Sequence, residues 1–179
     1  MGTRSNRVAI MGLFASLLAL IGCDKLGMSQ VVYTTGADVP QILQAASAEG
    51  PLGVEAMGDG FGLDAAALGE RVAAVLVANN PHPWLKFETD RAKSAGDYRM
   101  IFVFDARSVR QPDFPSICAG RAPKFERDTA RFNVHAVVCT PRGPVVAVHG
   151  WMKRPESFDD PALQRLIIQI GSQAVRGAT

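Results

Sequence analysis

The chain has 179 residues, with 19 lysines and arginines against 17 aspartates and glutamates, so its formal net charge at pH 7 is only +2. Its basic residues form no run or stripe, which argues against nucleic acid as a partner. The length is enough for one domain with a substantial apolar core.

The first 22 residues have the pattern of a secretory signal peptide. Residues 1–7 contain two arginines and no acid, and residues 8–22 form an uncharged, mostly apolar run that ends in small residues. This run is shorter than the about 20 apolar residues that a membrane-spanning helix needs. Without the segment, 17 basic residues remain against 17 acidic ones, so the expected mature chain has no net charge.

The apolar run ends in Leu20-Ile21-Gly22-Cys23, which resembles the lipobox of bacterial lipoprotein precursors. The resemblance implies that the Cys23 thiol is lipidated and that the chain is cut just before this residue. Two or three acyl chains give stable anchoring, since each buried methylene contributes about 0.8 kcal/mol. An ordinary cleaved signal, or an uncleaved anchor that contains a cysteine, is the alternative.

This resemblance implies an organisation and a location for the chain. We expect a signal peptide at 1–22, a lipidated tether at 23–30 and a single domain at 31–179. The partner is then a membrane, reached through the lipid anchor, and the domain faces the periplasm of the bacterial cell envelope. Whether the inner or the outer membrane holds the anchor is left open.

The other two cysteines are predicted to form a disulfide, Cys118–Cys139, because an exported chain lies in an oxidising compartment. The bond would close a loop of about 21 residues and stabilise the fold by roughly 3 kcal/mol. Two free buried thiols are the alternative. A metal site is less favoured, since there is no CxxC spacing and no nearby ligand.

Along the mature chain, capping residues and hydrophobic periodicity predict the elements. Three helices are expected, capped by Asp38, Asp64 and Asp160 and ending near Gly50, residue 80 and Gly177. Strands are expected at 31–33, 53–58, 84–90, 98–106, 131–139 and 144–152, with a long irregular surface loop at 107–130.

The last two strands are predicted to form a hairpin whose loop places Thr140 opposite Pro144 and Ala136 opposite Val148. One face of the hairpin is apolar and should pack on the helices. On the other face His135 lies opposite His149, and two imidazoles could share a zinc or copper ion. No third ligand is evident, so a solvated polar pair is favoured and no residue is assigned to a metal.

The element order predicts an α+β fold, a two-layer sandwich with a mostly antiparallel sheet of four to five strands and two or three helices on one face. No known catalytic motif is present, so no catalytic residue and no cofactor is assigned. The order is similar to that of small sandwich lipoproteins of envelope assembly and lipid transport. We expect a non-catalytic accessory or docking module of an envelope protein complex; the alternatives are a periplasmic small-molecule or metal-binding lipoprotein, and a hydrolase without a recognisable motif.

Overall fold

The computed structural model of the chain describes residues 27–58, 60–106 and 113–177. The expected signal peptide and the expected lipidation site, Cys23, lie outside the described residues. No helix in the described ranges is both long and apolar enough to cross a membrane.

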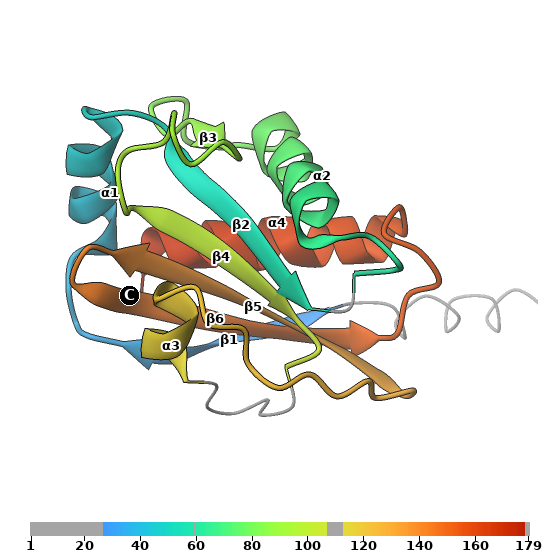
Figure 1. Ribbon diagram of the computed structural model, residues 1–179. Coiled ribbons are helices and arrows are strands. Elements are labelled where there is room, and N and C mark those ends of the chain that lie inside the picture. Colours follow the sequence, from blue (N-terminus) through green and yellow to red (C-terminus); the bar gives the residue numbers. More distant parts are fainter. Residues whose placement is uncertain (1–26, 59, 107–112, 178–179) are drawn as a thin grey trace, which may run out of the picture.

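A six-stranded mixed sheet forms the centre of the fold, in the order β1-β6-β5-β4-β2-β3 (Figure 1). The first four strands in this order are antiparallel neighbours, whereas β2 runs parallel to both β4 and β3. The strands are β1 Met28–Thr34, β2 Leu52–Gly58, β3 Phe87–Glu88, β4 Arg99–Phe104, β5 Arg131–Thr140 and β6 Gly143–Lys153.

Helices cover the two faces of the sheet unequally. Three of them, α1 (Val39–Ser47), α2 (Ala65–Ala78) and α4 (Pro161–Arg176), pack on one face and enclose the main core. We call this the helix face. The short α3 (Phe114–Cys118) lies on the opposite face, here the α3 face, over a second and smaller apolar cluster.

The predicted helix starts are confirmed, and each has the same local cause. Asp38, Asp64 and Asp160 accept hydrogen bonds from backbone N–H groups of the first turn, at 2.8 to 3.0 Å. These bonds satisfy N–H groups that have no partner within the helix. Gly177 follows the last residue of α4, as expected.

The predicted sheet is wrong in size and in strand direction. The helix between β2 and β3 makes them a β–α–β unit, and a strand that returns to the same sheet through a helix must run parallel to the first. The segment 90–98 then crosses back past β2 to begin β4 on its other side. The strand expected at 84–90 is reduced to two residues, and the strand expected at 31–33 begins at Met28.

The predicted hairpin register is confirmed over most of its length. Ala136 lies opposite Val148, as expected. Near the turn a bulge adds one residue to β6, so that Thr140 lies opposite Gly143 instead of Pro144. The apolar side of the hairpin does pack on the helix face.

The two ends of the sheet differ in what they carry. At one end, here the Met28 end, β1 and β5 begin while β2, β4 and β6 finish. The opposite end holds the β5–β6 turn, and we call it the turn end. In Figure 1 the Met28 end is on the right and the turn end on the left.

Candidate functional site

A cleft of about 650 Å³ opens at the turn end, between α3, the segment before β4 and the β5–β6 turn. Three arginines line it, Arg91, Arg99 and Arg142, and one acid, Asp97. The remaining lining is formed by Tyr33, Thr35, Pro115, Cys118, Ala119, Thr140, Pro141, Gly143 and Pro144.

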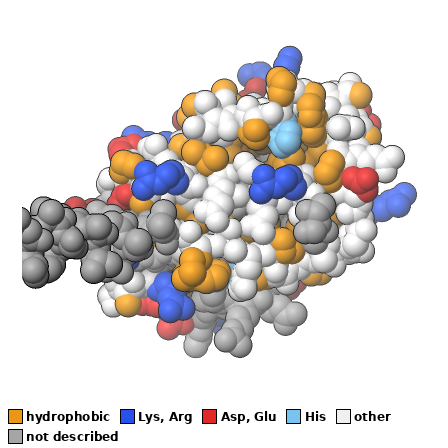
Figure 2. Space-filling model, turned by 180° about the vertical axis from the view of Figure 1, so that it is seen from behind, with side chains coloured by type: hydrophobic (Ala, Val, Ile, Leu, Met, Phe, Trp, Pro, Cys, Tyr) orange, Lys and Arg blue, Asp and Glu red, His pale blue; other side chains and the backbone are white. Residues whose placement is uncertain are grey.

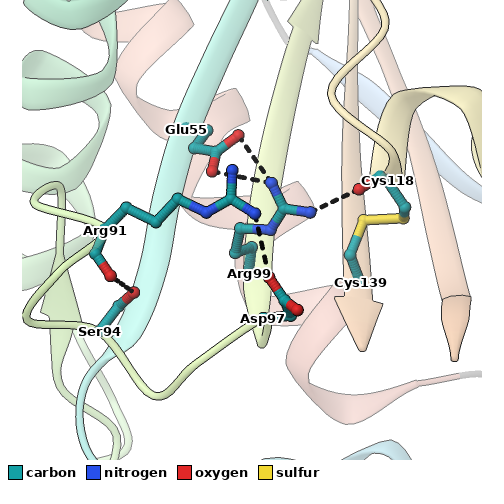
Figure 3. A network of polar contacts seen from close by, with 7 residues as sticks. All are labelled: Glu55, Arg91, Ser94, Asp97, Arg99, Cys118 and Cys139. Atoms are coloured by element: carbon teal, nitrogen blue, oxygen red, sulfur yellow. Dashed lines mark hydrogen bonds and ion pairs between the residues drawn. A yellow bond between two sulfur atoms is a disulfide. The ribbon is translucent and has the colours of Figure 1, made fainter. Parts of the chain in front are cut away.

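Arg99 is the buried arginine of the cleft, with only 5% of its side chain exposed. Its Nη1 donates to both carboxylate oxygens of Glu55, at 2.9 and 3.2 Å, and its Nη2 donates to the carbonyl of Cys118 (Figure 3). Its Nε is buried without a hydrogen-bond partner among the described residues. Since β2 carries Glu55 and α3 carries Cys118, Arg99 joins the parallel part of the sheet to the α3 face.

The disulfide Cys118–Cys139 holds α3 on β5 beside the same arginine. Its two Cα atoms are 5.5 Å apart, and Cys139 is the register partner of Arg99. At the other end of α3, Asp113 accepts hydrogen bonds from the backbone N–H and the hydroxyl of Ser116, and both bonds hold the pKa of the Asp113 carboxyl below its ordinary value. One wall of the cleft is therefore fixed by a covalent bond and by a helix cap.

The other two arginines are accessible. Arg91 pairs with Asp97 at 3.0 Å, with 61% and 58% of the two side chains exposed. Arg142 lies in the β5–β6 turn, and its exposed side chain makes no ion pair with a described residue. Because exposed ion pairs in water are weak, Arg91 can exchange Asp97 for another acid at little cost.

A second hollow of about 420 Å³ adjoins the cleft on the other side of the β5–β6 turn. The two share Thr35 and the turn residues 140–144, but the second adds Ala37, Ile42, Tyr98 and Val145, so it is more apolar. A group held by the arginines would thus have an apolar shelf beside it.

The chemistry of the cleft is that of hydrogen-bond donation. Guanidinium groups and the hydroxyl of Tyr33 line it, and such groups recognise carboxylates and phosphates. The hydroxyls of Thr35 and Thr140 also line the cleft, but they donate to the backbone carbonyls of Val145 and Gly143. The arginines escaped the sequence analysis because they are far apart in the chain. Arg99 is the first residue of β4, and a charged residue at the start of an apolar strand gives no functional signal.

The two histidines predicted to face each other do so, on β5 and β6 of the α3 face. His135 lies opposite His149, and their ring centroids are 4.6 Å apart. The expectation of a solvated pair is wrong: His135 is 0% exposed and His149 only 4%. Burial has its cause in the second apolar cluster, to which α3 contributes Phe114, Ile117 and Cys118. The sequence predicts an irregular loop at 107–130 in place of this helix.

Burial also sets the charge of His149. The loss of solvation, and secondarily the neighbouring His135 and Arg131, lower the pKa of His149 to about 4. Its Nε2 lies 3.2 Å from Oδ1 of Asn133, and Trp151 stacks on its other side. Within the described residues, no three His, Cys, Asp or Glu side chains are placed to hold a metal ion together.

Comparison with models of protein families, with curated proteins and with solved structures finds no match for this chain. The cleft is thus interpreted from its own chemistry alone. Figure 2 shows the molecule from behind the view of Figure 1. On that face the lysines and arginines are spread over the surface instead of gathered at one site.

Proposed function

We propose that this protein is a lipid-anchored lipoprotein of the bacterial cell envelope, and that it acts as a non-catalytic docking module through the cleft at its turn end. The lipobox resemblance supplies the anchor at Cys23. The cleft supplies the docking site, because its side chains recognise acidic groups and include no apparent nucleophile or metal centre within the described ranges.

The observation that carries this proposal is that the cleft lies at the turn end of the sheet, opposite the Met28 end where the described residues begin. Gly27, the first described residue, follows Cys23 by four residues, and four residues span at most about 14 Å. The Met28 end of the sheet is therefore held close to the membrane. β6 has 11 residues and runs from the turn end to the Met28 end, a distance of about 35 Å. The cleft is carried away from the membrane, where a protein partner can reach it.

The occupant that fits the cleft is an acidic or phosphorylated segment of a partner protein. Arg142 and Arg91 would hold its charged group and the adjoining hollow would take an apolar neighbour. The second candidate function, a periplasmic small-molecule-binding lipoprotein, is favoured by the size of the same cleft, since 650 Å³ lies within the range of small-ligand pockets.

The test of the anchor is the intact mass of the protein extracted from membranes of its native host. A chain that begins at Cys23 and carries diacylglyceryl and acyl groups is expected. An unmodified Cys23, or a chain that still begins at Met1, would refute the anchor.

The test of docking is site-specific photo-crosslinking in the same host. A photo-reactive residue in place of Ala119, which lines the cleft and is exposed, probes the cleft, and one in place of Arg165, exposed on α4, is the matched control. A protein captured through position 119 but not through position 165, and lost on Cys23→Ser, would support anchored docking. Capture of nothing through position 119, with a small anion recovered from the purified protein, would support the second candidate instead.

A further inference from the structure

At the Met28 end, the α3 face carries a group of exposed apolar and basic side chains on three adjacent strands. Met28 of β1 lies opposite Trp151 of β6, and Arg131 of β5 lies opposite Lys153 of β6. Side chains alternate between the two faces of a strand, so Trp151 and Lys153 share the α3 face with Met28 and Arg131. We call these four residues the Trp151 patch.

The apolar members of the patch are an exposed methionine and a partly exposed tryptophan. Met28 is 57% exposed, and Trp151 is half-buried with its ring stacked on His149 at 5.0 Å. Three large hydrophobic residues are exposed among the described ranges, and two of them, Met28 and Phe125, lie at this end. Phe125 forms a bridge with Ala106, just beyond the last residue of β4.

The two basic members are available for an external anion. Arg131 and Lys153 are exposed and form no ion pair with a described residue. Asp128, the acid closest to Arg131 in the sequence, uses its carboxylate to accept the backbone N–H groups of Ala130 and Arg131. Arg154 is different, because it is held by the buried Asp105 and by the carbonyl of Asp128.

We propose that the Trp151 patch is a membrane-contact surface that lies in the headgroup region of a bilayer containing anionic phospholipids. This inference rests on the proposed lipid anchor and adds to it a defined orientation of the domain. Because the segment from Cys23 to Gly27 spans at most about 14 Å, a lipidated Cys23 keeps the Met28 end near the bilayer surface. An indole, a flexible thioether and two cations are the side chains that partition to that interface.

The tryptophans of the chain provide the test, because there are only two of them. Trp84→Phe leaves Trp151 as the one tryptophan, and Trp151→Phe leaves Trp84; exciting the indole alone separates either from the two tyrosines. Trp84 lies before β3, whose pairing with the first residues of β2 places it towards the turn end. The purified protein, with its lipid state measured by mass, is added to phosphatidylglycerol vesicles whose acyl chains are brominated near the headgroup.

The patch predicts that Trp151 loses about half of its emission to the brominated lipid, whereas Trp84 keeps its emission. For a lipidated protein, unquenched Trp151 overturns the patch and leaves the anchor intact. If the protein is found without lipid, the anchor is refuted, and the quenching measurement still tests the patch. Quenching of Trp151 but not of Trp84 then supports the patch, whereas an unquenched Trp151 refutes the patch as well as the anchor. Quenching of Trp84 but not of Trp151 overturns the proposed orientation.

The charges are tested by Arg131→Gln with Lys153→Gln, against Lys86→Gln with Arg165→Gln as a control of equal charge. Each cation at the surface strengthens contact with an anionic bilayer about fivefold. The first pair should reduce Trp151 quenching to its value on uncharged phosphatidylcholine vesicles, and the control pair should leave it unchanged. Equal quenching of the wild type on both vesicle types would refute the role of the cations.

Discussion

His135 and His149 stack directly across β5 and β6, with ring centroids 4.6 Å apart and ring planes 23° apart. Trp151 continues the stack beyond His149, at 5.0 Å. A charge on His149 would be buried and close to the other ring, so the neutral form of His149 is favoured. His149 therefore acts as part of the packing of the α3 face at neutral pH.

Acid should destabilise the fold through His149. In the unfolded chain its pKa is about 6.5, and in the folded protein burial lowers it to about 4. Between these values the unfolded chain binds more protons, so the free energy of unfolding falls as the pH falls from about 7 to about 4, by about 3 kcal/mol in all. Below about 4 this contribution is already lost.

Urea unfolding of the wild type and of His149→Gln at several pH values between about 7 and 4 measures this effect. The variant should be less dependent on pH across the window, because its side chain does not titrate. The exposed Asp90 and Asp128, whose pKa values are lowered by hydrogen bonds, titrate in both proteins and cancel in the comparison. Equal pH slopes for the two proteins would refute the role of His149.

Removing the guanidinium of Arg99 should be strongly destabilising. Arg99→Met leaves the Glu55 carboxylate and the Cys118 carbonyl without their donors, and breaking a buried pair in this way costs about 3 to 5 kcal/mol. Because Glu55 is 28% exposed, water can reach it, and the lower figure is expected. Arg91→Gln, which breaks the exposed pair with Asp97, should cost less than about 1 kcal/mol.

Thermal or urea unfolding of these variants makes the comparison, and a third variant adds a check. Arg99→Met combined with Glu55→Gln should recover part of the lost stability, since no unpaired carboxylate remains. If Arg99→Met and Arg91→Gln cost the same, Arg99 is not the connection between β2 and α3 that its contacts indicate.

Loss of the disulfide should weaken the attachment of α3. The disulfide joins two cysteines that are 21 residues apart in the sequence. The double variant Cys118→Ala with Cys139→Ala should therefore lower the free energy of unfolding by about 3 kcal/mol. The same loss is expected for the wild type under reducing conditions. Counting thiols in the unfolded protein before and after reduction gives the direct check, and an equal count would exclude the bond.

Local sequence signals predicted the helices and the hairpin well, because their causes are local. The caps at Asp38, Asp64 and Asp160 are contacts over two or three residues, and the hairpin register follows from one turn and one apolar face. The bulge near the turn depends on how β6 also pairs with β1, where Thr35 N–H donates to the carbonyl of Val145, and no local pattern shows that contact.

The parallel strands and the α3 face were missed because their causes are distant in the chain. β2 was predicted only as a short strand at 53–58, but it lies inside the sheet between β3 and β4 and runs parallel to both. The burial of His135 depends on α3, a five-residue helix that hydrophobic periodicity cannot detect. The arginine cleft is likewise assembled from four separate segments, so only the fold brings its members together.

Two glycines in the core should respond to alanine in opposite directions. Gly150 lies on β6 against α4, and an added Cβ would approach Ile170 Cγ2 to 2.7 Å and Leu166 Cδ1 to 2.8 Å. Gly150→Ala should therefore destabilise the protein by about 1 to 3 kcal/mol through overpacking. Gly69 lies inside α2, where an added Cβ comes no closer than 3.7 Å, to Ala56 N.

Gly69→Ala should stabilise the protein by about 0.5 to 1 kcal/mol, because alanine loses less backbone entropy than glycine in a helix and this site has room for its methyl group. Urea unfolding of both variants beside the wild type measures the two shifts, and the sign of each is the prediction. A destabilised Gly69→Ala would mean that α2 packs more tightly on β2 than these distances state. If Gly150→Ala left the free energy of unfolding unchanged, α4 could move away from β6 at no cost. The contact between α4 and β6 would then not be what fixes the position of α4.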